Sequence, residues 1–326
     1  MNNRRKLIVA LGAGALSAPL ASFAQQAKVF RIGWLSNGTP ANSPFFEAFR
    51  GGMRDLGYIE GRNLVIEARF AEGSSERLDQ FALELVQLKP HVIVTQAGPV
   101  TWPVVRAKPT MPLVFGFSGD PVEAKLVDSY ARPGGNFTGV TFMSNELVGK
   151  RMEMLKEAIP SLKRVAIIAN PHHPGEQGEL HASQVAAKTL GLALDYHQVR
   201  TDAELETAFA AIVKARSEAV VVFPDAYMIN NSEKIAAFGL KNRIPAISGW
   251  AAFADRGLLM SYGPNLRDSF RRLATYVDKI LKGTKPADLP IEMPTTFEMV
   301  VNMKTAKSLG IKIPGTILVR TDRVIE

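Results

Sequence analysis

The sequence predicts an α/β protein made of two Rossmann-like lobes, each with its own parallel sheet. From residue 29 onward, short apolar runs alternate with longer amphipathic segments, which is typical of repeated βα units. The same alternation starts again near residue 146, after a first set of five apolar runs. At about 100 to 200 residues per domain, 326 residues are enough for two lobes.

The first set contains five apolar runs that we expect to be strands. They cover residues 29–35, 64–70, 92–95, 113–117 and 137–141. After the first run, Phe45, Phe49 and Met53 recur at helical spacing, and Gly57 ends the predicted helix. In a second predicted helix, Leu78, Phe81, Ala82, Leu85 and Leu88 recur at helical spacing, and Pro90 ends it because it cannot continue a helix.

The second set begins with a predicted helix over residues 146–158. Its predicted strands cover residues 164–169, 192–199, 219–223, 246–248 and 258–262. Thr201 and Glu204 have the spacing of a capping box, and Asn265 is the expected N-cap of a long helix that ends before Gly283. A proline-rich connector, a strand over residues 297–302, a helix to Leu309 and an extended tail complete the prediction.

The first 24 residues predict a cleaved secretory signal. Arg4, Arg5 and Lys6 precede an apolar stretch, and Ser22-Phe23-Ala24 has the small-x-small pattern of a cleavage site. The apolar stretch is shorter than the roughly 20 residues that a spanning helix needs. We therefore expect cleavage after Ala24 and export by the Sec route, with a twin-arginine signal as the alternative because Arg4 and Arg5 are adjacent.

Composition excludes several classes of function. Without the three cations of the signal, the net charge falls from +8 to +5, and the signal occupies the place where a DNA-binding regulator would carry its helix-turn-helix. No cysteine is present, which excludes thiolate catalysis and cysteine-held zinc or iron-sulfur clusters. His172 and His173 are adjacent in a predicted loop, so we expect no metal site. The sequence also predicts no cofactor and no catalytic residues.

Ligands of parallel α/β sheets bind at the carboxyl ends of strands, so the polar residues there are the predicted binding residues. Asp120 and Asp225 also fit helix caps, and Trp250, like Trp102, fits lobe packing as well as stacking on a flat ligand. For Asp225 we predict a contact with a cationic group of the ligand, with the cap as the alternative. The predicted ligand-binding residues are Ser36, Asn37, Gln96, Gly98, Ser118, Asp120, Asn170, Asp225 and Trp250.

Several blocks of sequence resemble bacterial ABC-transporter solute-binding proteins of the tryptophan- and tyrosine-binding type. The resemblance extends over almost all of the chain after residue 24. The blocks are GGMRDLGY at 51–58 with EGRN at 60–63, DPV at 120–122 with LV at 126–127, ARPGGN at 131–136, SYGP at 261–264, KPA at 285–287 and KTAK at 304–307. Lys125 stands where the family often has Gly, and the loops 36–43 and 96–102 do not match the tryptophan binders closely.

The resemblance implies a type I periplasmic-binding-protein fold with three crossovers between the lobes. The expected divisions are 1–24 for the signal, 25–143 plus 264–290 for the first lobe, and 144–263 plus 291–326 for the second. It implies a monomer of the periplasm that closes on a small molecule, such as an aromatic or other amino acid, and delivers it to an ABC permease of the inner membrane. It implies no enzyme activity and no nucleic-acid partner. The alternative is a ligand-sensing protein or an enzyme built on the same fold.

Overall fold

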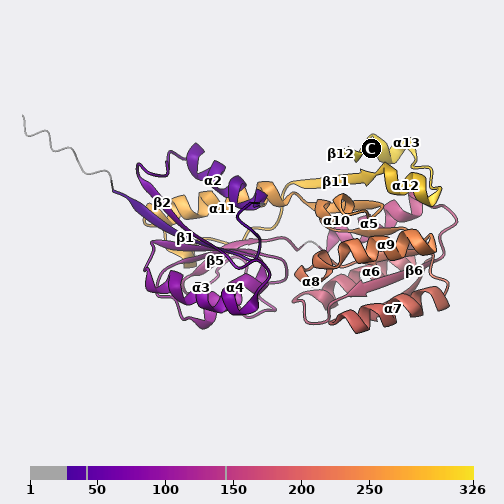
Figure 1. The fold of residues 1–326 in the computed structure, drawn as a ribbon, viewed down its shortest axis with the longest axis horizontal. Helices are drawn as coiled ribbons and strands as arrows, with labels where there is room; N and C mark the ends of the chain where they lie inside the picture. The colour runs from indigo at the N-terminus through magenta and orange to yellow at the C-terminus, as the bar shows by residue number, and fades with distance from the viewer. Residues whose placement is uncertain (1–27, 42, 144) are drawn as a thin grey trace, which may run out of the picture.

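A computed structural model describes residues 28–41, 43–143 and 145–326 as two lobes placed end to end (Figure 1). The predicted signal and its cleavage site lie outside the described residues. The first lobe is built on a parallel five-stranded sheet of order β2-β1-β3-β4-β5. Its strands are β1 (Phe30–Ser36), β2 (Leu64–Phe70), β3 (Val92–Gln96), β4 (Leu113–Phe117) and β5 (Phe137–Thr141).

Three helices of the first lobe come from the same stretch of chain, and a fourth returns from far along it. They are α2 (Pro44–Asp55), α3 (Ser75–Gln87), α4 (Gly98–Arg106) and α11 (Leu266–Leu281). Figure 1 shows α11, coloured orange, among the indigo and purple elements of this lobe. It packs against α2, and Tyr58 donates a buried hydrogen bond of 2.9 Å to Asp278 of α11.

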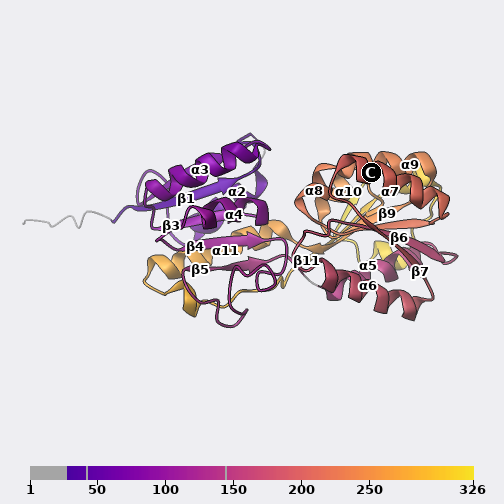
Figure 2. The ribbon, with the colours of Figure 1, turned by 90° about the horizontal axis from the view of Figure 1, so that it is seen from below.

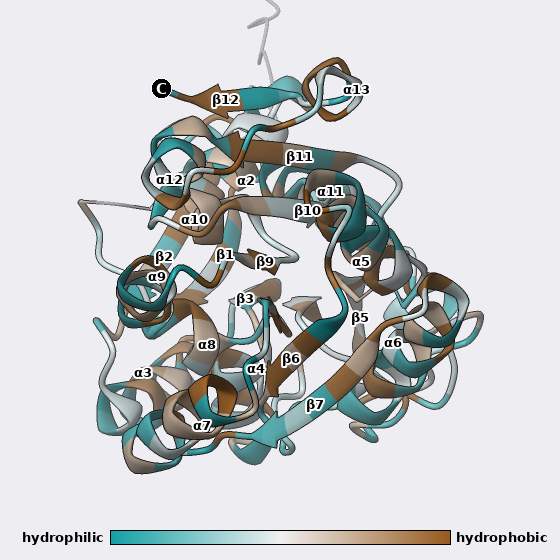
Figure 3. Cartoon of the chain, turned by 90° about the vertical axis from the view of Figure 1, so that its right-hand side faces the viewer, coloured by the Kyte–Doolittle hydropathy of each residue, from teal (hydrophilic) through white to brown (hydrophobic). Residues whose placement is uncertain are grey.

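The second lobe contains a seven-stranded sheet of order β12-β11-β10-β9-β8-β6-β7. Its strands are β6 (Arg164–Ala169), β7 (Ala193–Gln198), β8 (Ala219–Val222), β9 (Ala246–Ser248), β10 (Met260–Pro264), β11 (Phe297–Asn302) and β12 (Arg323–Ile325). Its helices are α5 (Glu146–Ala158), α6 (Glu176–Leu190), α7 (Asp202–Lys214), α8 (Ala226–Asn230), α9 (Ser232–Asn242), α10 (Ala251–Asp255), α12 (Met303–Leu309) and α13 (Gly315–Leu318). The apolar central strands lie among helices whose outer faces are hydrophilic (Figure 3).

The chain passes between the lobes three times, as Figure 2 shows from below. It leaves the first sheet after β5, returns after β10, and leaves again after the short 3₁₀ helix η1 (Pro286–Asp288). The last crossing runs beside β5, where Thr141 N donates to Glu292 O at 2.9 Å, and Arg272 holds the Glu292 carboxylate with two bonds of 2.8 Å. Short connections of this kind allow a hinge motion of the lobes.

Most predicted elements are found within two residues of their expected bounds, and the predicted two-lobe α/β fold is confirmed. Asn265 caps α11 as expected, because its Oδ1 accepts from Asp268 N at 3.1 Å. The capping box is present in part: Thr201 Oγ1 accepts from Glu204 N, but the Glu204 carboxylate accepts from Arg200 N, one residue before the N-cap.

Three expectations about local structure are wrong. Residues 98–102, predicted as loop, begin α4; Pro99 favours the first turn of a helix, but Pro103 inside the helix obscured the pattern. The extended tail instead contains α13 and β12, which are too short to produce a periodic signal. One strand pair is antiparallel, because β11 enters the second sheet from the third crossing and lies beside β10 in the opposite direction.

Within the part of the chain that the structure describes, no helix has both the length and the apolar character needed to span a membrane.

Candidate functional site

The carboxyl ends of the strands in both sheets border a cavity of about 460 Å³ that lies between the lobes. This volume is within the range of small-molecule sites, roughly 300 to 1,000 Å³. The cavity is lined by Ser36, Asn37, Gly38, Ser43, Pro44, Phe45, Gln96, Ala97, Pro99, Val100, Ser118, Phe142, Leu266 and Phe270 on the side of the first lobe, and by Ala226, Ile229, Asn230, Trp250, Ala252, Asp255 and Arg256 on the side of the second.

Aromatic rings form the apolar walls of the cavity. Phe45 and Phe270 are stacked with their centroids 4.8 Å apart, and Phe142 lies 5.2 Å from Phe270. The indole of Trp250 belongs to the second lobe, where it packs against Phe253 and is 7% exposed. Rings from both lobes therefore border one space, and flat apolar groups are the chemistry that such walls favour.

A polar pair marks the place in the first sheet where strand order reverses. Ser36 ends β1 and Gln96 ends β3, and Ser36 Oγ donates to Gln96 Oε1 at 2.8 Å. Gly38 N also donates to Ser36 Oγ at 3.0 Å. In open parallel sheets this reversal opens a crevice in which ligands bind. Both side chains line the cavity.

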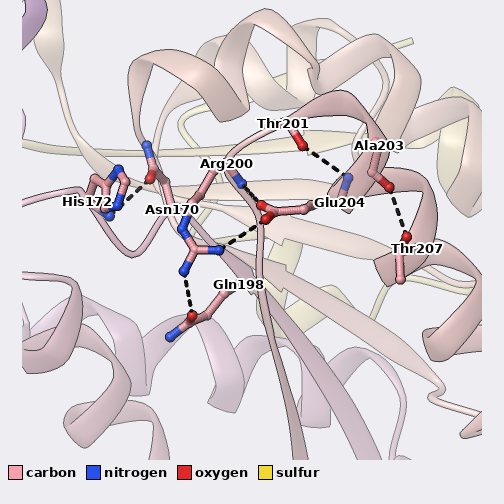
Figure 4. A network of polar contacts seen from close by, with 8 residues as sticks. All are labelled: Asn170, His172, Gln198, Arg200, Thr201, Ala203, Glu204 and Thr207. Atoms are coloured by element: carbon pink, nitrogen blue, oxygen red, sulfur yellow. Dashed lines mark hydrogen bonds and ion pairs between the residues drawn. The ribbon is translucent and has the colours of Figure 1, made fainter.

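The second sheet has an equivalent pair between β6 and β8. Asn170 follows β6, Asp225 follows β8, and Asn170 Nδ2 donates to Asp225 Oδ2 at 2.7 Å. Figure 4 shows the surroundings of Asn170, whose Oδ1 also accepts from His172 N at 3.0 Å. Asp225 Oδ1 caps α8 by accepting from Met228 N at 2.6 Å. The capping role is thus present, and a ligand contact by Asp225 stays a prediction.

The structure brings five of the nine predicted residues to the cavity: Ser36, Asn37, Gln96, Ser118 and Trp250. The other four, Gly98, Asp120, Asn170 and Asp225, are not part of its lining. Asp120 caps the turn after β4 through Val122 N at 2.7 Å and Glu123 N at 3.1 Å, and its own N–H donates to Pro174 O of the second lobe. Gly98 is buried, and the residues on either side of it, Ala97 and Pro99, do line the cavity. Trp102 packs instead with the cluster around Phe115 and Phe117.

Several cavity residues were missed because they look like core or surface in the sequence. Phe45 and Phe270 recur at helical spacing with buried residues and read as core, yet both also face the cavity. Asn230 ends the short helix α8, Arg256 directly follows the short helix α10, and no periodicity reveals either helix. Position was a usable signal for Phe45, which lies two residues after the loop 36–43 at the carboxyl end of the first strand.

A smaller annex of about 10 Å³ adjoins the cavity and shares Ser118, Phe142 and Trp250 with it. Its other walls include Arg151 of α5 and Glu179 of α6, whose side chains are 2% and 5% exposed. Arg151 Nη2 donates to Glu179 Oε1 at 3.2 Å, and Arg151 Nη1 lies 3.4 Å from Tyr262 O. A Cβ at position 249 would lie 2.5 Å from Arg151 Nη1, so Gly249 leaves room for the guanidinium.

The buried pair is incompletely satisfied. Among the described residues, Arg151 Nε and Glu179 Oε2 have no hydrogen-bond partner. Burial raises the pKa of Glu179, the interactions with Arg151 and His173 lower it, and the charge of Asp225 adds a smaller upward effect. Unpartnered polar atoms are costly in a dry interior, so a group that pairs with them gains free energy.

Among the residues that the structure describes, no group of three or more His, Asp or Glu side chains is placed to hold a metal ion.

Comparison with known proteins agrees with this geometry. Residues 39–325 match the model of the family described as ABC transporter substrate binding protein. A tyrosine-binding protein of Clostridioides difficile (strain R20291) is 23% identical over 261 residues, which cover 80% of this chain and 74% of that protein.

Two solved structures each match over 91% of this chain and the whole of their own. A protein described as an ABC domain in complex with L-Trp, from Streptococcus pneumoniae, superposes with a TM-score of 0.82 at 23% identity. A conserved domain protein from Vibrio cholerae O1 superposes with a TM-score of 0.80 at 27% identity. The arrangement of the two lobes is therefore the type I periplasmic-binding-protein fold that the sequence predicted.

Proposed function

Since this chain belongs to the family of ABC transporter substrate-binding proteins, we propose that it captures an amino acid with a flat, apolar side chain and delivers it to an ABC permease. The observation that carries this proposal is the cavity of about 460 Å³, which has aromatic rings from both lobes and polar side chains at its strand ends. The relatives named above for tyrosine and L-Trp support the same ligand class. No catalytic step is part of the proposal.

Different residues of the site contact the side chain, the carboxylate and the ammonium of the proposed ligand. The side chain lies between the rings of Phe45 and Trp250, which come from different lobes. The carboxylate is bound by neutral donors of the first lobe, among them Ser36 and Ser118, which need no second buried charge. Closure of the lobes brings the ligand's ammonium to the acidic side of the second lobe, where Asp225 lies between two residues that line the cavities, Pro224 and Ala226.

We propose the periplasm as the place of function. The basic start, the apolar stretch and the Ser22-Phe23-Ala24 site predict export and release of the chain from residue 25 onward.

We also propose that the protein acts as a monomer and that its lobes have the residue ranges expected from the sequence. Gly98, Asp120 and Asn170 then form the rim that approaches the ligand when the lobes close.

Titration calorimetry with the common L-amino acids tests this function. We expect L-tryptophan or L-tyrosine to bind most tightly and the small polar amino acids not to bind, because only flat side chains fill the space between the rings. The same titration with Trp250→Ala is expected to weaken binding by tenfold or more, since a stacked ring contributes about 1 kcal/mol beyond the area it buries.

Trp102→Ala is the matched control. Trp102 also follows a strand end of the first lobe, but it packs away from the cavity, so we expect its removal to leave affinity unchanged. Equal losses in the two variants would contradict the proposed position of the ligand side chain. Binding of sugars in place of every amino acid would contradict the ligand class.

A further inference from the structure

The annex behind the cavity contains a carboxylate with an unused oxygen. Glu179 is 95% buried, its Oε1 accepts from Arg151, and its Oε2 has no partner among the described residues. The annex volume of about 10 Å³ is close to the smallest space that holds one water-sized group. A primary ammonium is a group of that size, whereas a carboxylate is larger and would meet Glu179 with like charge.

The charges around the annex also favour a cation. Glu179 and Asp225 are close enough for the charge of Asp225 to raise the pKa of Glu179. Arg151 is the cation paired with Glu179, and burial lowers its pKa. Glu179 and Asp225 are two carboxylates beside one guanidinium, and the imidazole of His173 also lowers the pKa of Glu179. When that imidazole is neutral, one negative charge is left to be compensated in a buried place, and an isolated buried charge is expensive.

We infer that Glu179, held in place by Arg151, is a second acceptor for the ligand's ammonium, and that it makes the site selective for compounds with a primary ammonium group. This inference rests on the proposed function, because it places the head group of the same ligand. Asp225 and Glu179 then share one ammonium, which has three N–H donors. Arg151 acts as a positioning residue, since it holds Oε1 of Glu179 and leaves Oε2 without a partner among the described residues.

The experiment compares L-tryptophan with indole-3-propionate, which lacks only the ammonium. We expect the wild-type protein to bind L-tryptophan at least a hundredfold more tightly. In Glu179→Gln, affinity for L-tryptophan falls by tenfold or more, while affinity for indole-3-propionate does not fall. The ratio of the two dissociation constants is the readout, because a merely structural defect weakens the binding of both compounds by the same factor.

Glu176→Gln is the matched control on the same helix. Glu176 is also buried, but it pairs with Tyr196 and does not line the annex, so we expect an unchanged ratio. If Glu179→Gln fails to fold, Arg151→Met with Glu179→Met replaces both charges by apolar groups, which proteins tolerate. The double variant is expected to lose the same discrimination.

The outcomes separate this inference from the proposed function. A wild type that binds L-tryptophan and a Glu179 variant that keeps the wild-type ratio overturn the inference and leave the function intact. A wild type that prefers indole-3-propionate to L-tryptophan overturns both. The inference requires that the preference for L-tryptophan over indole-3-propionate falls in the Glu179 variants and stays at the wild-type value in Glu176→Gln.

Discussion

Replacing Asp225 by Asn is expected to weaken amino-acid binding by more than a hundredfold, about 3 to 5 kcal/mol. The substitution removes a buried carboxylate that faces the proposed ammonium and leaves that cation without one of its partners. The fold should remain, because Asn caps helices as well as Asp does. The cap on Met228 N persists if the new amide presents its oxygen to Met228. Its NH2 group then faces Asn170 Nδ2, which is also a donor, so the contact with Asn170 is lost unless the Asn170 amide turns over. Titration calorimetry measures the affinity, and a thermal melt checks the fold.

Asp255→Asn is the control for a simple loss of charge. Asp255 also lines the cavity, but it is about half exposed and pairs with Arg323 at 2.7 Å. Its loss should change affinity by less than about tenfold, since exposed ion pairs contribute little. If the dissociation constant of Asp225→Asn for the amino acid is within threefold of the wild-type value, Asp225 is a helix cap alone and is not part of the proposed site.

Arg151→Met is expected to lower the free energy of unfolding by about 3 to 5 kcal/mol at pH 7, because the substitution leaves Glu179 buried without its cation. The loss should depend on pH. Without Arg151, burial raises the pKa of Glu179 above the ordinary carboxyl value of 4.5 with less opposition. Below that ordinary value the carboxyl is protonated in both the folded and the unfolded chain, so the penalty is absent. The penalty grows as the pH rises above the ordinary value and is complete above the raised pKa.

Urea unfolding of the wild type and Arg151→Met at pH 4.5 and pH 7 measures this difference. Arg50→Met is the control, since Arg50 pairs with Glu47 and Glu60 at the surface and should cost less than about 1 kcal/mol at either pH. An Arg151→Met deficit that is the same at both pH values would show that lost packing, and not the charge of Glu179, causes the instability.

The strands of both lobes were predictable because parallel strands are buried on both faces. Runs such as residues 113–117 and 165–169 are continuous in apolar residues and are followed by polar ones, so their bounds are visible in the sequence. Short elements were not predictable in the same way. The helix α13 and the strand β12 are four and three residues long, which is too short to display a period.

The polar pairs at the strand ends were predictable for a geometric reason. Ser36 and Gln96 end neighbouring strands of one parallel sheet, and Asn170 and Asp225 follow neighbouring strands of the other; the carboxyl ends of such strands share one edge. Arg151 and Glu179 gave no such signal. In the sequence each is one charge on an amphipathic helix, and only the packing of α5 against α6 buries them together. The periodicity of α11 predicts a helix, but not that this helix belongs to the first lobe. That placement depends on the crossing of the chain after β10.

Small-angle X-ray scattering with and without a saturating amino acid tests the central claim most directly. The claim is that the two lobes close on a ligand held between them. With L-tryptophan, or L-tyrosine if calorimetry shows that it binds more tightly, we expect a smaller radius of gyration than for the protein alone, because the short crossings let the lobes rotate toward each other. An unchanged scattering profile, at a ligand concentration that calorimetry shows to be saturating, would contradict the account.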